Sequence, residues 1–561
     1  MNVRRIWRLP AAADVGGAFL LCVLYVFLLH PVFMLLTRSL ENDDGDFVGL
    51  ANFSAYLETP GLPAALGHSL IVAAAATVLT VLLAFVLAYG TTHTKMPGKR
   101  LCSVLVLAPL FMPSMLPGIG LVYLVGAQGP LGWLLCGHEL YGPLGVIMGS
   151  VFFCLPHATL LLRTSLERVD RRLYAAASGL GAGAVRRFLT VTLPGARYGL
   201  VSAALVTFTL TLTDFGVPKV LAGNYSMLST EIYRQVIGQQ DFGMGAVVSL
   251  VLLLPTAFTV TLDCMARRGQ ARMGSASGGA LVLRASPVRD ICFAVVIWTV
   301  TAALLAVCGM VLVASFMVFW PYDLSLCLDN YAFENLGYSW APFLTSLRLA
   351  FCVAVFGTGL LFLGAWLADR GGMSSALAFL YRTLLLLPLG LPGTVLGLTY
   401  IFAFNEPGSW YGVLYGSFFL LVANTVIHFS TVGQMTCSAA LEKVDRNSEN
   451  AGRLLGVPAW STFLRVILPQ CAGTVADLFL YLFINALTTV SAVVFLCSAD
   501  LTVASVSVLQ MYDSGNLGPA SAMGTLIFGA AGAAVLIRLA LAEAFGRKKN
   551  ISPVHGGKAR V

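Results

Sequence analysis

The sequence predicts an all-α polytopic membrane protein of about twelve transmembrane helices, built as two parallel repeats of six. Of its 561 residues, 58% are hydrophobic and only 11% are charged, and the mean hydropathy is +0.84. Charged residues alone make up about 25% of an ordinary soluble domain. Apolar runs near the ~20 residues that a helix needs to cross a bilayer recur along the chain, and one long polar pattern occurs twice.

The apolar runs divide into two sets of six. In the first half they lie at about 16–36, 68–89, 101–125, 143–162, 199–221 and 245–264. In the second half they lie at about 291–319, 343–367, 384–404, 412–428, 475–496 and 523–541. Because six is an even number, both halves enter the membrane with the same orientation, as parallel repeats related by an axis along the membrane normal.

Lys and Arg in short loops mark the cytoplasmic side, because positive charges near the ends of spans are retained there. They gather before the first span, after the second, in the first copy of the polar pattern and in mid-chain: Arg4, Arg5, Arg8; Lys95, Lys99, Arg100; Arg168, Arg171, Arg172, Arg186, Arg187; Arg267, Arg268, Arg272, Arg284 and Arg289. The opposite loops at 41–46 and 323–334 hold no Lys or Arg, and Arg38 is a minor exception. We therefore expect both termini and both copies of the pattern to be cytoplasmic.

The basic residues retained on the cytoplasmic side of the lipid bilayer explain the formal charge of +8. No nucleic-acid partner is therefore expected. The segment 267–289, with a GSASGGA core at 274–280, has the small and flexible composition of a linker. It separates a first six-span repeat at 1–266 from a second at 290–545, and a basic cytoplasmic tail occupies 546–561.

The polar pattern is the clearest internal repeat. The string LERVDRRLYAAASGLGAGAVRRFLTVTLP at 166–194 recurs without a gap as LEKVDRNSENAGRLLGVPAWSTFLRVILP at 441–469. Self-similarity at a fixed separation indicates two copies of one folding unit. The same separation relates Pro117 to Pro392. Prolines at membrane depth mark kinks that are tolerated beside protein or a water-filled path, so these two are weak candidates for the substrate path, and a packing role alone is an equal alternative.

In each copy of the pattern, a polar helix is followed by a glycine-containing turn and a V-x-L-P string. The spacing from glycine to proline is identical in the two copies, from Gly181 to Pro194 and from Gly456 to Pro469. This arrangement resembles the EAA loop of MetI-like permease subunits in binding-protein-dependent ABC importers, whose pattern is E-A-A, three residues, Gly and then I-x-L-P. The family's Glu falls at Ala175 and at Asn450, so the two copies read AAA and NAG. The resemblance covers essentially the whole chain as two fused permease units.

The resemblance implies a mechanism and a set of partners. Each loop would seat in a groove of one ATPase subunit, and closure of the ATPase pair would tilt the membrane helices from inward-facing to outward-facing. The partners would be two ATPase subunits and an extracytoplasmic binding protein, in the bacterial inner membrane. The residues that it assigns to ATPase coupling are Ala175, Ala176, Gly181, Pro194, Asn450, Ala451, Gly456 and Pro469. The alternative is two amphipathic surface helices that pack on their own bundle.

The sequence indicates no catalytic site, resident cofactor or metal. It contains no G-x-x-x-x-G-K-[ST] phosphate loop, so ATP and Mg would be used by a separate ATPase subunit. The seven histidines are scattered singly. The twelve cysteines show no ligand spacing apart from a lone Cys-Gly-His. We therefore expect a transport subunit and not an enzyme.

Charged residues at membrane depth are costly and mark functional sites by default. Asp214, towards the end of the fifth span, is the strongest such candidate for the substrate path, followed by Lys219. A residue that merely ends a helix is an equal alternative for Asp214. The corresponding residues of the second half, Thr489 and Val494, are uncharged. Weaker candidates are Asn424, Asn485 and Asp477.

The substrate is constrained only by a second resemblance. The stretch 213–249 resembles fused permeases grouped with ferric-iron importers, and most closely those assigned to 2-aminoethylphosphonate uptake. It therefore implies a small organophosphonate, with ferric iron as the alternative. A twelve-span secondary transporter driven by an ion gradient would also fit two parallel halves, although such a carrier should hold more acidic residues within its spans. A membrane scaffold that transports nothing is the functional hypothesis that we favour least.

Overall fold

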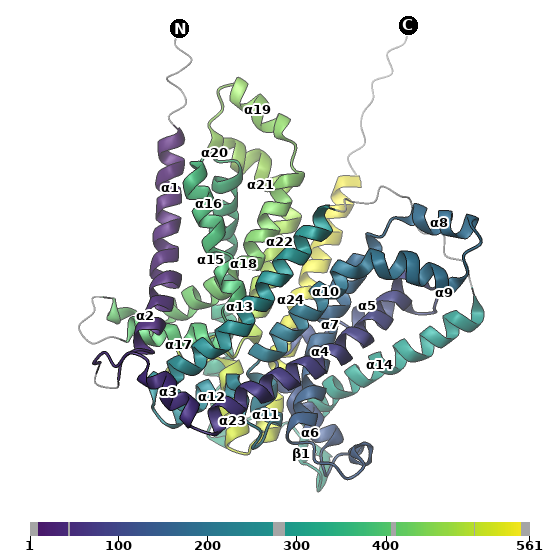
Figure 1. The fold of residues 1–561 in the computed structure, drawn as a ribbon, viewed down its shortest axis with the longest axis vertical. Coiled ribbons are helices and arrows are strands. Elements are labelled where there is room, and N and C mark those ends of the chain that lie inside the picture. The colour runs from purple at the N-terminus through teal and green to yellow at the C-terminus, as the bar shows by residue number, and fades with distance from the viewer. Residues whose placement is uncertain (1–8, 43–44, 273–285, 406–410, 499, 551–561) are drawn as a thin grey trace.

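The computed structural model describes residues 9–42, 45–272, 286–405, 411–498 and 500–550. Within these ranges the regular structure is helical apart from two short paired strands, β1 (Met317–Phe319) and β2 (Asp323–Leu326), and one isolated bridge between Glu41 and Phe47. Figure 1 shows two arms that converge at one end and diverge at the other, with α19 at the tip of one arm and α8 at the tip of the other. The prediction of an all-α polytopic membrane protein is confirmed.

The described part of the first half contains thirteen α-helices. They are α1 (Leu9–Leu24), α2 (His30–Arg38), α3 (Ala51–Glu58), α4 (Gly61–His93), α5 (Lys99–Leu105), α6 (Met115–Val125), α7 (Pro143–Glu167), α8 (Arg171–Gly179), α9 (Ala184–Arg187), α10 (Leu193–Thr213), α11 (Gly216–Leu221), α12 (Leu228–Tyr233) and α13 (Phe242–Arg272).

The second half follows the same order of long helices. They are α14 (Pro287–Ala314), α15 (Ala341–Asp369), α16 (Ser375–Leu384), α17 (Gly393–Phe404), α18 (Phe418–Lys443), α19 (Arg446–Leu454), α20 (Ala459–Thr462), α21 (Leu468–Gln470), α22 (Ala472–Thr488), α23 (Ala504–Asp513) and α24 (Leu517–Asn550).

Nine helical segments in the described part of the chain are long and apolar enough to cross a membrane unbroken. Three further spans are bent pairs, with bends of 108°, 113° and 77°. The first two are α5 with α6 and α16 with α17, the third span of each half, where a 3₁₀ turn carrying Pro109 or Pro388 precedes the bend. Counted as single spans, the pairs bring the total to the predicted twelve.

Several of the approximate span boundaries are displaced by five residues or more in the structure, and three of these shifts have a local cause. The fifth span, predicted to reach 221, ends at Thr213, because the backbone turns to an extended conformation at Asp214. The span predicted to reach 319 ends at Ala314, and β1 follows it. The span predicted to begin at 412 begins at Phe418, where the Ser417 hydroxyl accepts a hydrogen bond from the Leu420 N–H at 3.2 Å and caps the helix.

The first helix of each half packs against the other half. The Ser374 N–H donates to Asp14 of α1 at 2.7 Å, and the Tyr400 hydroxyl donates to the Phe27 carbonyl at 2.6 Å. In the opposite sense, α14 lies so close to α6 that a Cβ on Gly120 would sit 2.7 Å from the Val307 carbonyl oxygen. The halves are therefore consecutive in sequence but interlocked in space.

Some predicted features lie outside the described residues. These are Arg4, Arg5, Arg8, Arg284, the linker core 274–280 and the end of the tail at 551–561. In Figure 1, the start of α1, the end of α24 and α19 all lie towards the upper end of the molecule, and α8 lies towards the upper right. The cytoplasmic orientation of both termini agrees with this arrangement and stays a prediction.

Candidate coupling segments and substrate path

The two copies of the polar pattern fold as equivalent short helices, α8 and α19. Each begins at a capping aspartate: the Asp170 carboxylate accepts from the Arg172 N–H at 2.9 Å, and the Asp445 carboxylate accepts from the Asn447 N–H at 2.9 Å. A side-chain acceptor at this position satisfies one of the unpaired N–H groups of a helix's first turn. The repeat therefore specifies where each helix starts.

Each helix ends in a glycine turn. Gly181 has φ of 73° and Gly456 has φ of 70°, the left-handed conformation in which a side chain costs free energy and which commonly terminates helices. A Cβ at either glycine would meet no other atom within 4 Å. The backbone conformation, and not close packing within the chain, therefore requires glycine here.

The tips of the segments are open to a partner. The alanines and the asparagine at the EAA-like positions are all exposed: Ala175, Ala176, Asn450 and Ala451. Beside them, Leu180 and Leu455 are 87% and 81% exposed. Small residues flanked by exposed leucines form a surface on which another protein can pack closely, which favours docking over packing on the chain's own bundle.

The two prolines lie in the first turns of the helices that lead back towards the membrane, α10 and α21, where a missing N–H is tolerated. Before each proline, the chain forms a π-helical turn, at Phe188–Thr192 and at Phe463–Ile467. The two turns occupy equivalent positions in the two copies of the pattern. The repeated π turn has no signature of its own in the sequence, so sequence reasoning missed it. Such turns occur often at functional sites.

The two segments are held to the membrane helices by different chemistry. In the first half, His93 Nε2 lies 3.0 Å from the Tyr174 hydroxyl, which donates to Thr192 at 2.9 Å. In the second half, Glu449 replaces Tyr174 and pairs with Arg370 at 2.5 Å. Sequence reasoning assigned no role to Tyr174 and Glu449, which directly precede the EAA-like positions. It missed their partners, which lie 81 and 79 residues away.

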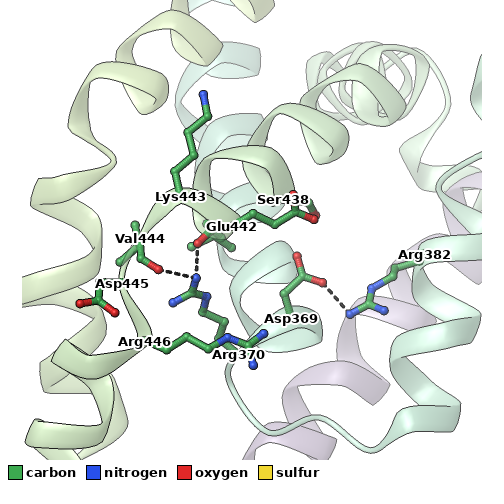
Figure 2. Close-up of a pocket in the computed structure, with 10 residues that line it drawn as sticks. Asp369, Arg370, Arg382, Ser438, Glu442, Lys443, Val444, Asp445 and Arg446 are labelled. Carbon is green, nitrogen blue, oxygen red and sulfur yellow. Dashed lines mark hydrogen bonds and ion pairs between the residues drawn. The ribbon is translucent and has the colours of Figure 1, made fainter. Parts of the chain in front are cut away.

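A recess of about 750 Å³ lies beside the start of α19. Figure 2 shows charged side chains from the ends of α15 and α18 and from α16 around it. Arg382 pairs with Asp369 at 2.5 Å, and Arg370 reaches backbone carbonyls at the end of α18. The second coupling segment is therefore attached through a network of charged groups.

Asp214 ends α10 and is partly buried. Its carboxylate accepts from the Val217 N–H at 2.8 Å, and its carbonyl accepts from the Ser229 hydroxyl at 2.6 Å. In the second half, Thr489 ends α22 with the same extended backbone, and its carbonyl accepts from the Ser505 hydroxyl at 2.5 Å. The break is thus repeated whereas the carboxylate is not. This geometry favours the helix-end interpretation of Asp214.

Lys219 is paired across the two halves. Its ammonium nitrogen lies 3.1 Å from Asp513 at the end of α23 and 5.2 Å from the centre of the Tyr233 ring. Beside it, the Tyr512 hydroxyl donates to the Val220 carbonyl at 3.0 Å. The structure therefore places Lys219 in a contact between α11 and α23.

The two candidate prolines lie at the bends of the broken third spans. Pro117 is buried in the first turn of α6, and Pro392 is buried at the residue before α17. Each helix that they begin is buried along most of its length. Of the weaker candidates, Asn424 donates to the Ala492 carbonyl at 2.7 Å and Asp477 pairs with Arg538 at 2.9 Å. Packing accounts for these positions as well as a substrate path does.

The model of one protein family matches residues 78–320 and 360–547, and its description is "binding-protein-dependent transport system inner membrane component". The chain belongs to this family. Because the model matches twice, the chain is a fused permease that holds two copies of the unit, as the repeated pattern predicted. The permease is a multi-pass inner-membrane protein, and the family name states that a binding protein takes part in transport.

Relatives of the permease carry the names of ferric and molybdenum transport systems. The ferric transport system permease protein of Actinobacillus pleuropneumoniae is 25% identical over 461 residues, which are 79% of this chain and 66% of that protein. A putative ferric transport system permease protein of Haemophilus influenzae is 23% identical over 87% of this chain and 78% of its own length. The molybdenum transport system permease protein of Azotobacter vinelandii is 32% identical over 29% of this chain and 73% of its own length.

Proposed function

We propose that this permease forms the translocation path of an ABC importer for ferric iron. Two relatives that match it along most of its length are named as ferric transport permeases, and the molybdenum permease matches less than a third of it. In a transporter built of two repeats, the substrate path runs between the repeats. Similarity to the ferric permeases over both halves therefore supports ferric iron better than similarity to the molybdenum permease over a single repeat supports molybdenum.

The coupling segments support two ATPase subunits for each permease chain, both using ATP and Mg. Each segment presents the same exposed turn at the tip of one arm (Figure 1). The residues that would contact the ATPase are the predicted ones: Ala175, Ala176, Gly181, Asn450, Ala451 and Gly456. Pro194 and Pro469 would fix the direction in which each segment leaves the membrane.

A small organophosphonate such as 2-aminoethylphosphonate is the second candidate substrate. It is favoured by the resemblance of residues 213–249 to permeases assigned to phosphonate uptake. That stretch carries two cationic side chains, Lys219 and Arg234, of which Arg234 is half exposed. Each is paired with a carboxylate, Lys219 with Asp513 and Arg234 with Glu231, so the charge of this stretch does not by itself favour an anion over a ferric ion.

Two measurements test the proposal. Mild purification of the tagged permease should recover two ATPase subunits per chain together with a binding protein, and recovery of no ATPase after crosslinking would contradict the importer assignment. Cells that lack the gene should then lose uptake of radioactive ferric iron and keep uptake of labelled 2-aminoethylphosphonate. The reverse result would establish the phosphonate as substrate.

A further inference from the structure

The Arg370 guanidinium links the second coupling segment to the ends of two membrane helices. Arg370 ends α15, and its side chain is only 5% exposed. One of its nitrogens contacts the Glu449 carboxylate in α19 at 2.5 Å. The other donates to the carbonyls of Leu441 and Val444, the latter at 2.8 Å (Figure 2).

These three interactions join the end of α15 to the end of α18 and to α19. The last carbonyls of a helix have no partner within the helix, and Leu441 and Val444 lie at the end of α18. A cation is favoured there by the helix dipole. The planar fork of arginine can bond these carbonyls and a carboxylate at once, which the single ammonium of lysine does less well.

We propose that Arg370 is the positioning residue of the second coupling segment, because it makes α15, α18 and α19 move as one body when an ATPase displaces α19. This inference rests on the proposed importer function. In the first half, the position that aligns with Arg370 holds an exposed lysine, Lys95. The first segment is instead linked through the Tyr174 hydroxyl to His93 at the end of α4 and to Thr192 in the π turn before α10. The two ATPase contacts are therefore mechanically different.

The matched variants are R370Q and Y174F, in the full-length protein in lipid nanodiscs and in cells. R370Q should raise amide hydrogen exchange in α19 by about tenfold or more and leave α8 unchanged. Y174F should raise exchange in α8 and leave α19 unchanged. R370K should restore part of the protection of α19. E449Q, which keeps the two carbonyl bonds, should have an intermediate effect and serves if R370Q fails to fold.

Transport provides the functional readout. In complexes that retain their ATPase, R370Q should lower uptake of radioactive ferric iron by about tenfold for each ATP hydrolysed. Unchanged exchange in α19, or normal uptake despite a loosened α19, would overturn the inference. If the unmodified permease takes up no ferric iron, the proposed substrate fails, while the contrast in exchange between α19 and α8 still decides whether Arg370 holds the segment.

Discussion

The backbone leaves the helical conformation at Asp214 after α10 and at the equivalent Thr489 after α22. Only the first of these helix ends has a carboxylate that caps the turn after it. The Asp214 carboxylate caps the next turn through the Val217 N–H, whereas Thr489 occupies the equivalent place. We predict that D214A destabilises the permease by about 1 kcal/mol, the usual effect of losing a cap, and that D214T retains uptake within a few-fold. Thermal unfolding in detergent and an uptake assay measure the two effects. Loss of uptake in a D214T protein of normal stability would show that the carboxylate contacts substrate.

The glycines of the two coupling turns have a different requirement. Gly181 and Gly456 adopt positive φ with open space around them, so alanine costs about 1 to 2 kcal/mol through backbone strain alone. We predict that the G181A/G456A protein inserts normally and shows weakened ATPase co-purification and uptake. Asparagine, which tolerates this conformation better, should recover part of both. The control is G179A, because Gly179 lies in α8 and its added Cβ also meets nothing within 4 Å. Normal ATPase binding by G181A/G456A would show that these turns are not part of the surface that contacts the ATPase.

At the scale of elements, the π turns fix how each coupling segment is rotated relative to the membrane. A single residue corresponds to about 100° of helix rotation. We therefore predict that deleting one residue from Phe463–Ile467, which turns the π turn into an α turn, abolishes uptake without loss of insertion. The same deletion in Phe188–Thr192 should act alike if both segments couple. Uptake together with surface labelling measures the outcome, and unimpaired uptake would show that the register of the segment does not matter.

The elements also show which features the sequence can specify. Local signals were sufficient for the glycine turns and for the bends at Pro117 and Pro392, because each depends on its immediate neighbours. The link from Arg370 to Glu449 could not be inferred, since its partners lie 79 residues apart and the first half has Tyr174 at that place. The crossed packing of α1 and α14 was equally hidden, because an apolar run does not reveal which half it packs against.

At the scale of the whole molecule, α11 and α23 form one local contact between the two halves, which also pack together through α6 with α14 and through α2 with α17. Lys219 and Asp513 are 23% and 41% exposed in their side chains, so their attraction is screened and contributes at most about 1 kcal/mol to stability. The Tyr512 hydroxyl and the Val220 carbonyl add a second contact between the same two helices. A contact of this strength can favour closure of α11 against α23 at rest and still break when the arms move.

The charge of the pair can be reversed to test this role. We predict that K219D, which places two carboxylates together, raises the resting rate of ATP hydrolysis of the complex several-fold, because repulsion favours separation of α11 from α23. The doubly reversed protein, K219D/D513K, should return the rate towards its original value. Reversal of Arg538 and Asp477, a pair 2.9 Å apart within the second half, provides the matched control and should leave the rate unchanged. If K219D alone hydrolyses ATP at the original rate, or if the double reversal fails to correct it, the pair does not hold the halves together, and Lys219 becomes again a candidate for contact with the substrate.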